Sequence, residues 1–297
     1  MNLSSIAVSL PYVTLALLVA TLFTIRCRKI IAVVLAAQIF LAFIYGIMNS
    51  LGLSAVAAFW AICALHWRNL SSKEWLNTVR ILLIAAIAIG FANHMIPGFH
   101  NMRVFEGILI SPHAVPFTMY LNFDKTIAAV ILAMTSGLLF KQSGSFGMKA
   151  ARETVVIFAL CISLLVPLAV LSGYVNFEPK FPETFWLWAF NNLLFVCFAE
   201  EVIFRGLIQT QLIRMANRCQ ISPFIPIFIS ALLFATALPG HFQGGLPLIA
   251  FSAFAGLFYG YAYYRTNRLE AAILVHFMVN VCHFLLFSYP MAARLGH

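Results

Sequence analysis

Residues 198–206 read Phe198-Ala199-Glu200-Glu201-Val202-Ile203-Phe204-Arg205-Gly206 and place two adjacent carboxylates and an arginine near the end of an apolar run. Ionisable groups at membrane depth are functional candidates, because they are costly unless they are paired or hydrated. On a helix, Glu201 and Arg205 are four positions apart with the acid first, which favours an ion pair. Glu200 points about 100° away from Glu201, so we expect it to lack this partner. The alternative places both acids at the surface of a helix end, paired with Arg205, Arg214 or Arg218.

The composition is that of a polytopic membrane protein. Of the 297 residues, 63% are hydrophobic and only 9% are charged, whereas soluble domains carry roughly 25% charged residues. The six cysteines are scattered without a CxxC pair, so they indicate neither a disulfide framework nor a zinc ribbon. The formal net charge of +9 comes without a basic cluster interleaved with aromatic residues, and we therefore expect no nucleic-acid partner.

The chain contains ten apolar segments of a length that suits membrane spans, since about 20 apolar residues cross the hydrocarbon core. The expected spans are residues 5–25, 30–48, 51–67, 81–96, 126–140, 154–175, 184–204, 223–238, 247–264 and 270–289. The sequence therefore predicts an all-α membrane helical bundle of about ten transmembrane helices. We interpret residues 1–153 as an N-terminal transmembrane scaffold of about five spans. Residues 154–297 are interpreted as the core, with the chemistry in the last four helices.

The lysine and arginine residues predict how these spans are oriented. Alternate connections hold fourteen of the 18 basic residues, whereas the other set, with the C-terminal tail, holds Arg103, Lys125, Lys180 and Arg294. The positive-inside rule then assigns the first set to the cytoplasm and both termini to the outside. We expect a multi-pass protein of the plasma membrane, corresponding to the inner membrane of a bacterium.

The long outer connection, residues 97–125, carries several aromatic side chains and is expected to lie as a cap against the lipid headgroups. Three histidines occur in or near it, His94, His100 and His113. They suggest a metal site as an alternative, but their irregular spacing gives no common helical face.

Polar groups that suit the interior of a membrane site recur in the last third of the chain. His276 and Asn280 lie one helical turn apart on the same face, at a depth similar to that expected for Glu200. Between these two positions in the sequence lies the segment Ser230-Ala-Leu-Leu-Phe234-Ala-Thr-Ala-Leu-Pro-Gly-His241.

The order Glu-Glu-x-x-x-Arg, then Phe and His, then His-x-x-x-Asn, each on its own apolar segment, resembles the CPBP family. These are the CAAX-processing and bacteriocin-processing intramembrane endopeptidases, glutamic-type by mechanism and metalloendopeptidases by older naming. The resemblance covers about residues 184–285. In the family the second element has its histidine four positions after the phenylalanine, which is Leu238 here, and this chain has His241 instead. Pro239 and Gly240 would have to end the helix early for His241 to fold back.

The resemblance implies an intramembrane endopeptidase that hydrolyses a peptide bond in a membrane-embedded or lipidated protein. Glu200 would be the general base that activates water, with His241 helping to orient that water. His276 and Asn280 would donate hydrogen bonds to the oxyanion, and Glu201, held by Arg205, would brace the site. The resemblance implies no metal ligand and no cofactor.

Two alternatives follow from the same residues. A zinc-dependent form of the protease would use two histidines and a glutamate with an open position for water, although zinc more often takes paired histidines from one helix. A non-enzymatic transporter or membrane scaffold would use the two glutamates as a proton relay. Transporters often show inverted repeats, and none is visible in this sequence.

Overall fold

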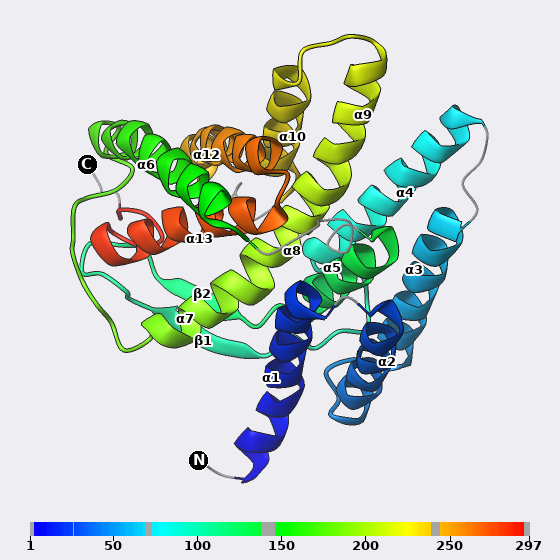
Figure 1. Cartoon of the computed structure of the whole chain (residues 1–297). Helices are drawn as coiled ribbons and strands as arrows, with labels where there is room; N and C mark the ends of the chain where they lie inside the picture. The colour runs from blue at the N-terminus through cyan, green and yellow to red at the C-terminus, as the bar shows by residue number, and fades with distance from the viewer. Residues whose placement is uncertain (1–2, 26, 69–72, 138–145, 239–243, 294–297) are drawn as a thin grey trace. The chain divides into compact units, whose positions relative to one another are not determined.

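The computed structural model describes residues 3–25, 27–68, 73–137, 146–238 and 244–293, which are mostly helical (Figure 1). Helices overlap each of the ten expected spans. Within the described residues, six helices are long and apolar enough to cross a membrane: Ser50–Arg68, Trp75–Ala92, Met148–Leu171, Phe185–Arg218, Gly245–Thr266 and Leu269–Leu286. Two shorter apolar helices are Leu10–Thr24 and Phe224–Ala237. The protein is therefore a multi-pass helical membrane protein, while the count of ten spans stays a prediction.

The chain folds into two compact units, each assembled from separate parts of the sequence. The first unit comprises Met1–Met102, Leu121–Ser143 and Leu194–Leu207. The second unit comprises Arg103–Tyr120, Gly144–Leu193 and Ile208–His297. The division into an N-terminal scaffold and a protease core at residue 153 stays a prediction about the organisation of function.

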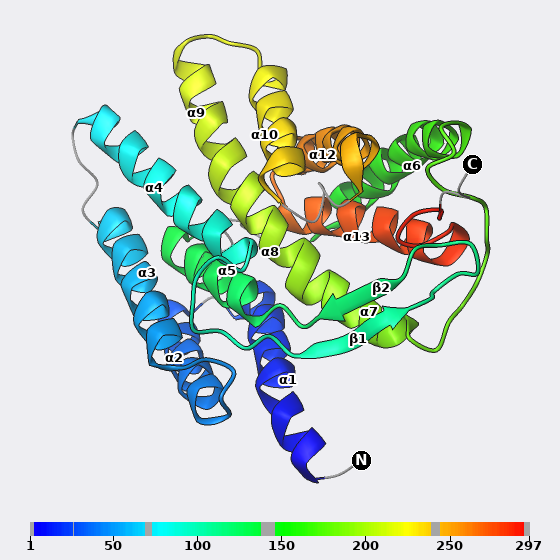
Figure 2. The ribbon, with the colours of Figure 1, turned by 180° about the vertical axis from the view of Figure 1, so that it is seen from behind.

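The first unit is built around helix α5 (Phe123–Ser136). Its other helices are α1 (Leu3–Thr24), α2 (Arg28–Ile44), α3 (Ser50–Arg68) and α4 (Glu74–Ala92). α5 packs against all four (Figures 1 and 2), and every residue from Phe123 to Met134 is buried. A helix that is apolar on all sides has to be covered all round, and the small and β-branched residues after Thr126 allow neighbouring helices to approach closely.

The second unit is built around helix α12 (Gly245–Thr266), which packs against α6 (Met148–Leu171), α10 (Phe224–Ala237) and α13 (Leu269–Leu286). Figures 1 and 2 both show α6, α12 and α13 side by side. Gly260 of α12 allows one close approach, because a Cβ there would lie 2.5 Å from Oε1 of Gln209. The Gln209 Nε2 donates to the Gly260 carbonyl over 2.8 Å.

The connection expected to be an interfacial cap contains a β-hairpin, so the fold is not purely α-helical, while its position against the headgroups stays a prediction. Strand β1 (Arg103–Ile108) pairs antiparallel with β2 (Phe117–Tyr120), with Phe105 opposite Met119. Met119 is buried in a cluster with Phe185, Trp188 and Phe284 of the second unit. In β2 the burial follows the alternation of side chains along a strand, with Met119 buried between the exposed Thr118 and Tyr120, whereas the register shifts interrupt this alternation in β1.

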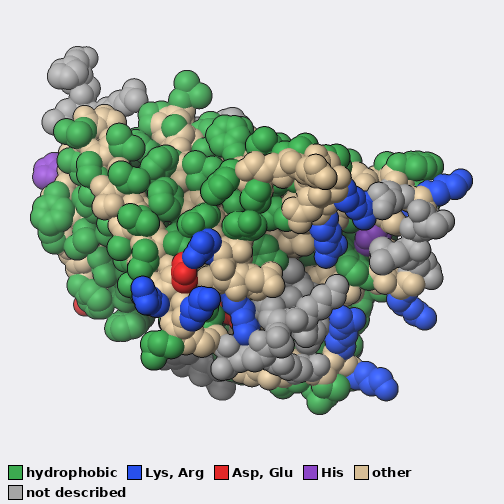
Figure 3. Space-filling model, turned by 45° about the horizontal axis from the view of Figure 1, so that its top comes forward, with side chains coloured by type: hydrophobic (Ala, Val, Ile, Leu, Met, Phe, Trp, Pro, Cys, Tyr) green, Lys and Arg blue, Asp and Glu red, His purple; other side chains and the backbone are tan. Residues whose placement is uncertain are grey.

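The surface agrees with a lipid environment. Large hydrophobic side chains are exposed along several helices; in α6, for example, Leu164 and Leu168 are about half exposed and Leu171 is 85% exposed. The face shown in Figure 3 is largely hydrophobic, and the charged side chains visible on it are mostly lysine and arginine. In water such a surface would be unfavourable, whereas lipid chains cover it without loss of hydrogen bonds.

Candidate active site

The two adjacent glutamates lie near the middle of a 34-residue helical run, Phe185–Arg218, and not near its end as the apolar run predicted. The run consists of α7 (Phe185–Asn191), η1 (Asn192–Cys197), α8 (Phe198–Glu201), η2 (Val202–Gln209) and α9 (Thr210–Arg218). The stretches η1 and η2 are π-helical, so the short α8 with Glu200 and Glu201 lies between two π-helical segments. Such segments are rare and frequently occur at functional sites.

Glu201 and Arg205 form the ion pair that their spacing predicts. The Arg205 Nη1 donates to Oε1 of Glu201 over 3.0 Å, and both side chains are fully buried. A surface position for this acid, the alternative drawn from the sequence, is therefore wrong. Because a buried charge without its partner is strongly unfavourable, the pair fixes the orientation of Glu201 and of the helix around it.

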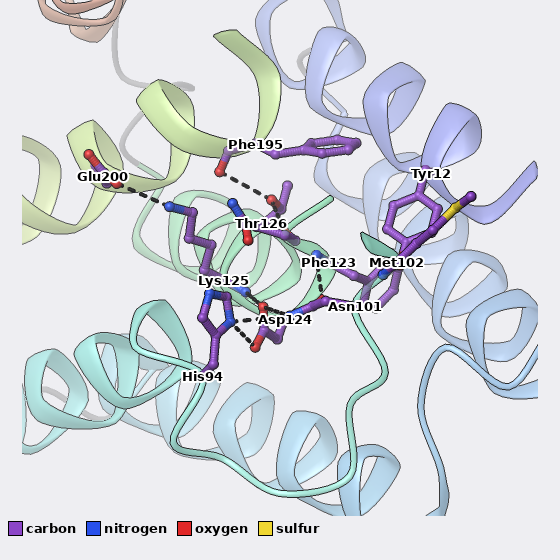
Figure 4. A network of polar contacts seen from close by, with 11 residues as sticks. Tyr12, His94, Asn101, Met102, Phe123, Asp124, Lys125, Thr126, Phe195 and Glu200 are labelled. Carbon is purple, nitrogen blue, oxygen red and sulfur yellow. Dashed lines mark hydrogen bonds and ion pairs between the residues drawn. The ribbon is translucent and has the colours of Figure 1, made fainter. Parts of the chain in front are cut away.

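Glu200 is also buried, and it has an ion-pair partner that the sequence did not indicate. The Lys125 Nζ donates to Oε1 of Glu200 over 3.0 Å, and the two side chains are 7% and 8% exposed (Figure 4). The sequence placed Lys125 in an outer connection, whereas the structure places it in the first turn of α5. The sequence signal that could have drawn attention to Lys125 was its position immediately before a short apolar segment. It could not identify Glu200 as the partner of Lys125, because the two residues are 75 positions apart.

A polar network holds the first turn of α5 (Figure 4). The Asp124 carboxylate accepts from Nδ2 of Asn101 over 2.9 Å and lies 2.7 Å from Nδ1 of His94. It also accepts from the backbone N–H of Lys125 over 2.8 Å, while the Asn101 Oδ1 accepts from the backbone N–H of Phe123 over 2.9 Å. Backbone donors at a helix start have no partner within the helix, so these side chains satisfy them.

His276 lies on α13 in the second unit with its ring between two aromatic side chains. The ring stacks on Tyr259 with centroids 4.5 Å apart and an interplanar angle of 14°. It meets Phe234 edge-on, at 5.7 Å and 84°. These contacts restrict the imidazole to one plane, and His276 is only 4% exposed. Phe234 belongs to the second motif of the sequence, so the structure brings members of the second and third motifs together.

Asn280 lies one turn after His276 and contacts the helix that carries the glutamates. Its Nδ2 donates to Oδ1 of Asn192 over 3.2 Å. Asn192 begins the π-helical stretch η1 and stands eight positions before Glu200 in the same helical run. Sequence reasoning did not select Asn192, although an asparagine pair, Asn191 and Asn192, inside an apolar span was a signal that could have found it.

The remaining predicted member, His241, lies outside the described residues. Helix α10 ends at Ala237, and Leu238 is extended with φ −111° and ψ 115°. This end is expected because the residue before a proline is disfavoured in helical geometry. Leu238 occupies the position where the family has a histidine, and it is buried. The convergence of Glu200, in the first unit, with His276 and Asn280, in the second, stays a prediction.

The alternative metal site near the outer connection is not formed by the histidines that suggested it. His94 bonds to Asp124 and His113 bonds to Glu178 over 2.9 Å. Among the described residues, no group of three or more His, Cys, Asp or Glu side chains is arranged to hold a metal ion. The zinc set proposed with His241 includes a residue beyond those described and stays untested.

Comparison with protein families finds a match for the segment that carries the two glutamates, His276 and Asn280. Residues 182–282 match the family described as Type II CAAX prenyl endopeptidase Rce1-like. The match includes both glutamates, Arg205, His276 and Asn280, and it leaves Lys125 outside. Comparisons with curated proteins and with solved structures gave no match. Residues 182–282 are therefore similar to the Rce1-like type II CAAX prenyl endopeptidases of the CPBP family.

Proposed function

We propose that this protein is a glutamic-type intramembrane endopeptidase that cleaves a membrane-embedded or lipidated protein, with Glu200 as its general base. The observation that carries the proposal is the state of Glu200: a buried carboxylate in a membrane-spanning helix, inside the segment that matches the protease family. A buried acid at membrane depth is unfavourable unless it is paired or functional. Glu200 has a lysine partner, which allows it to remain charged in this position.

The two glutamates have different roles in this proposal. Glu201 is fully buried and bound by Arg205, and it serves to hold the helix. Glu200 accepts a proton from the attacking water as the water oxygen bonds to the carbonyl carbon of the substrate. When the carbon–nitrogen bond breaks, the protonated carboxyl returns this proton to the leaving amine, so the base is regenerated.

The oxyanion that forms after water attack needs hydrogen-bond donors that are already oriented. Asn280 supplies its side-chain amide, which the contact with Asn192 orients. His276 supplies a ring N–H, and the stacking on Tyr259 fixes the plane of that ring. Donors held in place before the reaction stabilise the developing charge without reorganisation. His241 keeps its proposed role in orienting the water.

The chemistry around Glu200 favours a mechanism without a metal ion. A lysine ammonium 3.0 Å from the carboxylate already supplies a positive charge to it. A zinc ion on the same carboxylate would meet that ammonium at close range, and like charges in a poorly hydrated site repel strongly. Glu200 is therefore better suited to proton transfer than to metal binding.

The test uses the purified full chain in proteoliposomes with two probes: a fluorogenic peptide ending in a prenylated CAAX sequence, and a transmembrane helical peptide. We expect the wild type to cleave at least one probe and Glu200→Gln to cleave neither. Because this substitution removes the counter-charge of Lys125, Glu200→Asp is the matched control. It keeps the charge with a shorter side chain, so we expect folded protein with strongly reduced turnover. Turnover by Glu200→Gln at the wild-type rate would remove Glu200 as the base.

A further inference from the structure

The geometry points to Lys125 of helix α5 as a positioning residue that holds the Glu200 carboxylate in place for catalysis. The inference rests on the proposed function of Glu200 and extends it to a segment outside the family match. The Lys125 Nζ reaches Oε1 of Glu200 over 3.0 Å from a different helix, so its hold does not depend on the conformation of the glutamate helix alone.

The lysine itself is held at both of its ends. Its backbone N–H donates to Oδ1 of Asp124, which Asn101 and His94 fix in turn (Figure 4). Its side chain is only 7% exposed, so the flexible stem of the lysine has few alternative conformations. A donor whose own position is fixed can orient its acceptor, whereas a mobile surface lysine cannot.

A second contact ties α5 to the helix that carries Glu200. The Thr126 hydroxyl lies 3.3 Å from the carbonyl oxygen of Phe195 and 2.6 Å from that of Asn122. Phe195 belongs to the π-helical stretch that precedes α8. The ring of Tyr12 also contacts both helices: its centroid lies 6.2 Å from that of the Phe123 ring and 6.3 Å from that of the Phe195 ring. The first turn of α5 and the backbone before the glutamates therefore form one packed assembly within the first unit.

The consequence for the reaction follows from these contacts. A general base has to present its carboxylate at hydrogen-bond distance from the attacking water. Small errors in this placement lower the rate strongly even when the substrate still binds. Lys125 therefore acts on turnover through Glu200 and needs no contact with the substrate.

The first experiment measures kcat and KM on the two probes for Lys125→Met and Lys125→Arg. We expect Lys125→Met to lower kcat by about 10²-fold, as misplacement of a reacting group does, with KM changed less than about 2-fold because binding groups are untouched. Lys125→Arg keeps the positive charge and should recover part of the loss. Lys149→Met removes an exposed lysine of α6 and is the control with unchanged kcat. Wild-type kcat in Lys125→Met would overturn the inference.

The second experiment does not depend on activity and separates the inference from the proposed function. It compares the melting temperatures of Lys125→Met, Glu200→Gln and the double variant in the same detergent. A buried ion pair predicts that each single variant melts lower than the wild type and that the double variant melts higher than either single variant. Additive losses would overturn the pairing, and with it the inference.

Coupled melting temperatures together with a wild type that cleaves neither probe would overturn the proposed function and any role of Lys125 in turnover, while the ion pair would stand. Should Lys125→Met fail to fold alone, Lys125→Arg still gives a kcat and a KM, because it leaves no unpaired charge in the core. A double variant that folds where Lys125→Met does not would itself show the coupling expected of the pair, whereas a double variant that also fails to fold would overturn it.

Discussion

The Lys125 ammonium lies 3.0 Å from the Glu200 carboxylate, so a helix outside the family match supplies the counter-charge of an acid inside it. The neighbouring acid, Glu201, is paired within its own helix by Arg205. Two adjacent carboxylates are thus buried next to one another because each has its own cation, which removes most of the repulsion that would otherwise keep them apart.

Substitution of either partner in the Glu201–Arg205 pair should destabilise the fold more than it changes the chemistry. We expect Glu201→Gln to lower the free energy of unfolding by about 3–5 kcal/mol, because Arg205 is left as a buried charge without its counter-charge. Thermal and denaturant unfolding in detergent measure this loss. The matched control is Glu153→Gln, which removes a partly exposed partner of Arg265. Similar unfolding midpoints for the two variants would contradict the prediction.

Removal of the Asn280 amide should reduce the rate of cleavage with little effect on folding. One oxyanion donor accounts for roughly 10²–10³ in kcat, so we expect a loss of that size in Asn280→Ala. Asn192→Ala should cause a smaller loss, because it removes only the acceptor that orients Asn280. The comparison of kcat for the two variants measures this difference. A larger loss in Asn192→Ala than in Asn280→Ala would reverse the assigned roles.

Chelation should leave cleavage unchanged if Glu200 acts as a base beside an ammonium. We expect the protein purified with a strong chelator to retain its turnover on the prenylated and transmembrane probes. The control is the same preparation with zinc added back in excess over the chelator. Loss of turnover that zinc restores would favour the metal-dependent alternative and would require that Lys125 give up its contact with Glu200.

The close approach at Gly260 should disfavour a branched side chain at this position. A Cβ there would lie 2.5 Å from Oε1 of Gln209 and 3.1 Å from Cγ2 of Ile227. We expect Gly260→Val to lower the melting temperature, because α12 would have to move away from the helices that it contacts. Ala255→Val, at another buried position of the same helix, is the control for overpacking in general. A Gly260→Val variant with the wild-type melting temperature would show that the contact is not restrictive.

Several features of the protein could be predicted from residue types and spacing alone. The apolar content predicted a multi-pass membrane protein, and the spacing of Glu201 and Arg205 predicted their ion pair, which the structure confirms. The order of the three motifs predicted the family that residues 182–282 match. These are local properties: each depends on the composition of one segment or on positions one helical turn apart, and a regular helix converts such spacing directly into geometry.

Tertiary structure decided the features that depend on distant parts of the chain. The partner of Glu200 comes from α5, 75 positions earlier, and Asn192 meets Asn280 across 88 positions. The outer connection became a hairpin because Met119 could be buried against Phe185 and Trp188. No spacing rule connects such positions, since only the packing of helices brings them together. The sequence by itself therefore determined the membrane class, the local ion pair and the motifs, whereas the environment of Glu200 was set by the fold.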